Sequence, residues 1–156
     1  MSDRETLTTE NLTTEVNAWF FDDYLTTWVG VGNGTVGQGP DFILAYWGAP
    51  LFHGHPDGAE WLPDGAAVVG MLAAMHTRLR ADGYAYTEIP DRSVRVYHRN
   101  GAAIEVIWSR CRADNSEIER LAVHFEAIRT EHGWRIAGIQ SRPTQADTLA
   151  DAWGGR

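Results

Sequence analysis

The sequence predicts one α+β domain in which the helices come first and an antiparallel sheet comes last. Two observations lead to this fold class: apolar residues recur at helical spacing in the first half of the chain, and they alternate from about residue 84 onward. A length of 156 residues with 44% hydrophobic residues is enough for one domain with its own core. We expect that domain over residues 9–142, between a flexible N-terminus, 1–8, and a C-terminal tail, 143–156.

Three helices are expected before the main sheet. The first runs from about Thr9 to Val29, where the apolar side chains form one stripe. It ends at a glycine-rich loop, residues 30–40, whose Gly-x-Gly-x-x-Gly spacing lacks the flanking strand and helix of a dinucleotide site. A short second helix follows at 42–47. The third lies between Asp64, a good N-cap residue, and Gly83, a residue suited to the position after a helix.

Strands are expected on both sides of the third helix. Short ones precede it, and longer ones follow it with alternating apolar and polar residues. The expected strands are 50–54, 60–62, 84–88, 93–99, 102–112, 118–129 and 134–141.

The register of the central strands follows from their turns. A two-residue turn at Asn100-Gly101 pairs Arg99 with Ala102, and a turn centred on Asn115 sets Glu105 opposite Phe125. This register places Glu105 on the face that packs on the helices. That inner face also carries Val94, Val96, Leu121 and Val123, whereas the outer face carries Tyr97, Trp108, Arg110 and His124.

Three local patterns resemble the NTF2-like, or SnoaL-like, superfamily over roughly residues 9–142. They are Tyr24-x-x-x-Trp28 in the first helix, the short helix Ile43–Trp47, and the turn Glu131-His132-Gly133-Trp134-Arg135-Ile136. The resemblance implies a cystatin-like cone, in which a curved, mostly antiparallel sheet wraps around three helices and leaves a pocket at its open end. The superfamily includes ketosteroid isomerases, polyketide cyclases, scytalone dehydratase and limonene epoxide hydrolase. It also includes transport factors and pocket-bearing proteins without a known reaction, so the fold does not settle the function.

The resemblance can be carried over to individual residues. Tyr24 matches the tyrosine that donates to the oxyanion in the isomerases. The position of their catalytic aspartate falls near His53-Gly54-His55, and that of their second, acidic donor falls on Phe125. Because neither position holds a carboxylate, we do not expect a steroid-isomerase mechanism.

Glu105, His53 and His55 are the candidate proton-transfer residues, with Tyr24 as the oxyanion donor. A lone carboxylate among apolar side chains loses hydration, which raises its pKa and suits a general acid or base. Alternatively, Glu105 lies near the solvent-accessible rim of the concave face and pairs with an arginine. His53 and His55 share one side of a strand, so either could shuttle a proton.

The two histidines also allow other interpretations. Together with His98, or with Asp57 and Glu60, they could instead bind a metal, or they could form a polar loop edge. The predicted site itself includes no metal and no cofactor.

An aromatic wall is expected to bind the substrate. Trp19, Phe20, Trp47 and Trp61 could line a pocket for a flat organic ligand, with Phe125 and His98 beside them. The alternative is that these aromatic residues, and Tyr24 with them, belong to the core.

These residues favour an enzyme that works without an organic cofactor. We expect acid–base chemistry (isomerisation, cyclisation, dehydration or epoxide hydrolysis) on a small hydrophobic ligand, or, as the alternative, a non-catalytic binding or interaction module. The amphipathic outer face predicts a homodimer. A net charge of −8 argues against nucleic acid, and the short apolar runs argue against a membrane. The single cysteine, Cys111, and a polar N-terminus predict a cytoplasmic protein.

Overall fold

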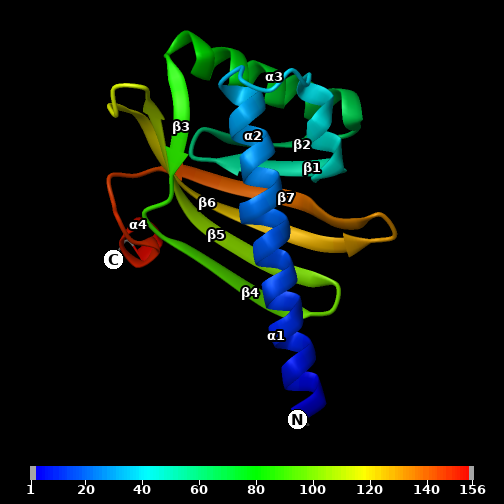
Figure 1. Ribbon diagram of the computed structural model, residues 1–156. Helices are drawn as coiled ribbons and strands as arrows, with labels where there is room; N and C mark the ends of the chain where they lie inside the picture. The colour runs from blue at the N-terminus through cyan, green and yellow to red at the C-terminus, as the bar shows by residue number, and fades with distance from the viewer. Residues whose placement is uncertain (1–2, 155–156) are drawn as a thin grey trace.

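The N-terminal half of the protein begins with one long helical segment. The computed structural model describes the backbone of residues 3–154 and the side chains of residues 9–154. The segment comprises α1 (Asp3–Asn17), a π-helical stretch η1 (Ala18–Tyr24) and α2 (Leu25–Gly32), and it runs across the sheet without a break (Figure 1). It therefore starts before the predicted Thr9, inside the stretch that was expected to be flexible.

The remaining helices are shorter than this first segment, and the third has the ends that the sequence predicts. The expected second helix is a 3-10 helix, η2 (Pro40–Ala45). The third, α3 (Gly65–Ala81), begins where the Asp64 side chain accepts a hydrogen bond from the backbone N–H of Ala67 at 2.9 Å. Gly83 follows this helix with φ +87°, a conformation that glycine adopts without strain.

Within residues 3–154, seven strands form a single, mostly antiparallel sheet. They are β1 (Trp47–His55), β2 (Gly58–Leu62), β3 (Tyr84–Glu88), β4 (Arg92–His98), β5 (Gly101–Arg112), β6 (Glu117–Thr130) and β7 (Gly133–Pro143). Their order is β2-β1-β7-β6-β5-β3, with β4 also paired to β5, and only β1 and β7 run parallel. The predicted α+β fold, a curved sheet packed around helices, is confirmed.

The main core lies between the long helical segment, α3 and the inner face of the sheet. Val16 and Phe20 from the first segment and Leu72 from α3 are completely buried there. Ile104 and Val106 of β5 reach the same core from the sheet. None of the helices in the described part of the chain is long and apolar enough to cross a membrane.

The outer face of the sheet is partly covered by a fourth helix. α4 (Leu149–Gly154) buries Ala152 against Ile107 and Ala122. Its start is held by Asp91, whose carboxylate accepts from the backbone N–H of Leu149 at 2.8 Å. Residues 143–156, expected to be a tail, thus include a helix that packs on the surface predicted to form a homodimer. The dimer itself stays a prediction.

The register of β5 differs from the predicted one. Glu105 pairs with Ser93 on β4 and with His124 on β6, instead of facing Phe125. A register shift between Val96 and His98 and a one-residue slip relative to β6 together reverse which side chains of β5 point inward. The expectation that Glu105 faces the helices is therefore wrong, whereas the inner faces predicted for β4 and β6 are correct.

Candidate functional site

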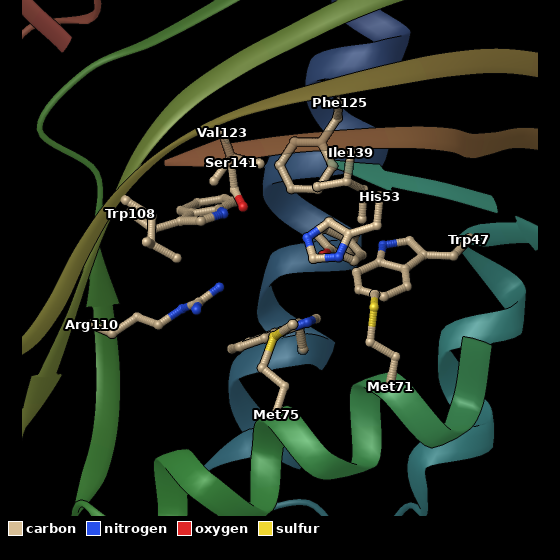
Figure 2. A pocket seen from close by; sticks show the side chains of 13 residues that line it. Trp47, His53, Met71, Met75, Trp108, Arg110, Val123, Phe125, Ile139 and Ser141 are labelled. Atoms are coloured by element: carbon tan, nitrogen blue, oxygen red, sulfur yellow. The ribbon is translucent and has the colours of Figure 1, made fainter. Parts of the chain in front are cut away.

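A cavity of about 50 Å³ lies between the helices and the inner face of the sheet. One wall is formed by β5, β6 and β7, where Trp108, Val123 and Ile139 face the interior (Figure 2). Met71 and Met75 rise toward it from α3. Most of the lining is apolar or aromatic, which is the usual character of a small-molecule site.

Tyr24 and Trp47 bring polar hydrogens into this apolar space. Tyr24 belongs to η1 and is 2% exposed, and burial raises its pKa far above the ordinary range, so the hydroxyl keeps its proton at neutral pH. The nearby Trp47 indole opposes this rise. Within the described residues, however, Trp47 Nε1 is buried and has no hydrogen-bond partner of standard geometry. An unpaired buried donor is costly, so it marks a place where a ligand atom could accept.

Arg110 is the buried cation of the site. Its side chain reaches the cavity from β5 (Figure 2), with the guanidinium 4.7 Å from the centre of the Trp28 ring. One nitrogen pairs with Glu119 at 2.6 Å, whereas its Nε is buried without a partner among the described residues. Arg78 also pairs with Glu119, at 3.1 Å.

The charges of this group do not cancel. Burial by itself would raise the pKa of Glu119, but attraction to Arg110 and hydrogen bonds from both arginines outweigh it and lower the pKa. Glu119 is therefore ionised at neutral pH. Two guanidinium groups share one carboxylate. Arg78 is half exposed, so solvent screens its charge, whereas Arg110 is buried beside the cavity and has only a share of Glu119.

His53 lies on β1 at the other side of the cavity, and 16% of its side chain is exposed (Figure 2). Burial lowers its pKa, although Glu60, whose carboxylate is 3.6 Å from Nδ1, acts in the opposite direction. The net direction is down, so the imidazole is neutral at pH 7. His55 follows two residues later, with its ring centre 5.1 Å from that of His53, but it is exposed and outside the cavity.

Four of the predicted site residues come together around the cavity. They are Tyr24, Trp47, His53 and Phe125. Phe125 lies on β6 and packs 4.9 Å from Phe20, ring centre to ring centre.

Glu105, the predicted acid or base, does not take part. Its carboxylate is on the outer face, 3.0 Å from Nδ1 of His124, and that histidine is 3.3 Å from Glu126 on its other side. The physical reason is the shifted register of β5, which exchanges Glu105 for its neighbours Ile104 and Val106 on the inner face. No carboxylate is found among the described residues that line the cavity.

The other predicted binding residues lie elsewhere. Phe20 is fully buried core, and Trp19 is half-buried beside Tyr46. Trp61 on β2 is 69% exposed, and His98 is exposed at the turn after β4, where it accepts from the backbone N–H of Asn100. The alternative interpretation, that aromatic residues fill the core, fits Phe20 better than ligand binding does.

Sequence reasoning missed Trp108 and Arg110, which it placed on the outer face. The run from Ala102 to Trp108 is apolar at every position but Glu105, so alternation could not decide which set points inward. The charge of Arg110 favoured the solvent side. In the structure, Glu119 and the Trp28 ring compensate for its burial.

Comparisons with known proteins agree with this architecture. Residues 14–144 match the family described as NTF2-like protein (DUF6841). No curated protein sequence matches the chain.

Solved structures share the fold at low sequence identity. An NTF2-like protein of unknown function from Pseudomonas putida KT2440 superposes with a TM-score of 0.63 at 10% identity, over 85% of this chain and 87% of that one. An NTF2-like protein with a cystatin-like fold from Novosphingobium aromaticivorans gives a TM-score of 0.54 at 17% identity, over 93% and 94%. An uncharacterised protein with a cystatin-like fold from Caulobacter vibrioides gives 0.60 at 14%, over 86% and 92%.

Such likeness supports the fold alone, whereas the family match covers most of the sequence. The chain therefore belongs to the NTF2-like protein (DUF6841) family.

Proposed function

We propose that the cavity binds a small hydrophobic carboxylic acid, with its carboxylate directed at Arg110 and Trp47. The observation that carries this proposal is the pair of buried donors, Arg110 Nε and Trp47 Nε1, that make no hydrogen bond of standard geometry within the described part of the chain. A ligand oxygen that accepts from them would remove the cost of leaving them unpaired.

An acceptor with negative charge fits better than a neutral one. Tyr24, Trp47 and Arg110 all offer hydrogens, and the arginine pair shares the single carboxylate of Glu119. In the apolar surroundings of the cavity, the buried guanidinium of Arg110 attracts an anion more strongly than it would in water. A ligand without charge would gain the hydrogen bonds but not this attraction.

The lining of the cavity favours an aromatic ring, and its size requires the lining to move to admit one. A volume of about 50 Å³ is smaller than the ~150 Å³ of a cavity known to hold benzene. The aromatic ring of Trp108 in the lining suits contact with a planar group. Met71 and Met75 are unbranched and adaptable, so they are the side chains that can move to admit it.

Binding is favoured over the acid–base chemistry that the sequence suggested. That chemistry assigned proton transfer to Glu105, His53 and His55. Glu105 faces away from the cavity and contacts His124, and of the three only His53 lines the cavity. Because the described lining has several hydrogen-bond donors but no carboxylate to work with that histidine, it is better equipped to hold an anion than to carry out acid–base chemistry.

Isothermal titration with benzoate and cinnamate tests the proposal, using Trp47→Phe as the key variant. This change keeps an aromatic ring but removes the N–H. Loss of a hydrogen bond to a charged oxygen, worth about 1.5 kcal/mol or more, should weaken binding about tenfold. Because that N–H makes no hydrogen bond of standard geometry in the free protein, the variant should lose no more stability than its weak contact with the Tyr24 hydroxyl provides.

Two control variants separate the donor from other effects. Trp61→Phe changes an exposed tryptophan outside the cavity and should leave affinity unchanged. Ile139→Val trims the lining without removing a donor and should weaken binding less than about threefold. Equal losses in Trp47→Phe and Ile139→Val, or no saturable binding of either acid to the wild-type protein, would refute the assignment.

A further inference from the structure

The β1–β2 hairpin brings three potential metal ligands close together. His53 and His55 are two residues apart on β1, so their side chains leave the same face of the strand. Glu60 on β2 is the direct cross-strand partner of His53. Each residue offers one ligand atom, and these atoms all lie within 4.8 Å of one another.

The separations are close to those that one metal ion requires. Two ligands bound at about 2.0–2.1 Å to one tetrahedral ion lie about 3.4 Å apart. His53 Nδ1 and the Glu60 carboxylate are already 3.6 Å apart. The imidazole rings of His53 and His55 are centred 5.1 Å apart, so a small rotation of the exposed His55 side chain completes the approach.

The nitrogen of His53 is prepared for coordination. Its Nδ1 is buried and makes no hydrogen bond of standard geometry to any described residue, so no existing bond must break. His55 Nδ1 accepts from the backbone N–H of Asp57 at a long 3.3 Å. Coordination through either nitrogen of His55 ends that contact, which is exposed and therefore costs little.

We propose that His53, His55 and Glu60 bind one divalent transition-metal ion, with Zn²⁺ as the favoured occupant. Two imidazoles and one carboxylate form a ligand set that suits zinc and its neighbours better than Ca²⁺ or Mg²⁺, which prefer oxygen ligands alone. The structure selects Glu60 as the third ligand, rather than His98 or Asp57, from the alternatives that the sequence left open.

The site borders the cavity without depending on it. The His53 ring also lines the cavity, whereas His55 and Glu60 are exposed and give an ion access from solvent. Three protein ligands leave a fourth position of a tetrahedral ion for water or another small group. Metal binding can therefore be tested separately from the binding of a carboxylic acid.

A calorimetric titration of the metal-free protein with Zn²⁺ alone tests the proposal. The full chain is used without a histidine tag, because a tag would bind the same ion. We expect one Zn²⁺ per chain. His55→Ala and Glu60→Gln should each weaken binding at least about tenfold, and substitution of Co²⁺ should give the visible absorption of a tetrahedral site.

Matched controls make the result specific. His98→Ala and His132→Ala remove exposed histidines outside the hairpin and should leave Zn²⁺ affinity unchanged. Trp47→Phe should also leave Zn²⁺ affinity unchanged. Conversely, His55→Ala and Glu60→Gln should leave benzoate affinity unchanged. Failure of one proposal can therefore be distinguished from failure of the other. Absence of saturable Zn²⁺ binding, or equal losses in the hairpin and control variants, would overturn the metal site.

Discussion

His76 should make the folded protein sensitive to mild acid. This residue of α3 is 2% exposed, with its ring edge-on to Trp28 at 4.3 Å and stacked with Phe42. Burial, followed by repulsion from Arg80 and Arg110, lowers its pKa to about 4. Neither ring nitrogen has a partner among the described residues, so nothing compensates for protonation.

The size of the effect follows from the difference in pKa between the two states. The unfolded chain takes up the proton near pH 6.5, whereas the folded protein does so only near pH 4. Between these values the unfolded state binds more protons, so the free energy of unfolding falls as the pH falls. A difference of this size corresponds to about 3 kcal/mol, all of it lost by about pH 4.

Urea unfolding of the wild-type protein and His76→Leu at pH 7, 6, 5 and 4 measures this contribution. Leucine cannot be protonated, and it removes two unpaired nitrogens, so we expect the variant to lie within about 1.5 kcal/mol of the wild type at pH 7. The carboxylates are common to both proteins, and their effects cancel in the difference. The variant should gain about 3 kcal/mol relative to the wild type by pH 4. A difference that stays constant with pH would refute the reasoning.

Two further predictions concern carboxylates on the two faces of the sheet. Glu105→Gln should leave benzoate affinity within about twofold of the wild type in a calorimetric titration, because Glu105 contacts His124 on the outer face. A tenfold loss of benzoate affinity would instead show that Glu105 belongs to the binding site. Glu119→Gln should lower the free energy of unfolding by about 2 kcal/mol at pH 7, because it weakens the ion pair with Arg110. Since the pKa of Glu119 is lowered, the loss should shrink as acid protonates it in the wild type, and a loss independent of pH would contradict the ion pair.

Local signals in the sequence predicted the elements and the inner faces of β4 and β6. Asp64 and Gly83 bound α3 because each satisfies a specific need of a helix end, which requires no knowledge of the rest of the fold. Alternation worked for β6, where Val123 and Phe125 are apolar while His124 and Glu126 are polar.

The candidate site could be predicted only in part, because its geometry depends on one strand. Tyr24, Trp47, His53 and Phe125 were found from helical position, spacing and family likeness. β5 is apolar on both faces, since α4 covers Ile107 on the outer side. Its orientation therefore depends on shifts at the neighbouring turns, which pattern does not reveal.

The most direct test of the proposed cavity function compares benzoate with benzamide on the wild-type protein. The two ligands have nearly the same shape, but only benzoate carries a negative charge, which the buried Arg110 attracts because it shares its partner Glu119 with Arg78. Hydrogen bonds to a charged group exceed neutral ones by about 1 to 1.5 kcal/mol, so calorimetry should find benzoate bound about tenfold more tightly. Equal affinities, or tighter binding of benzamide, would contradict an anion site in this cavity.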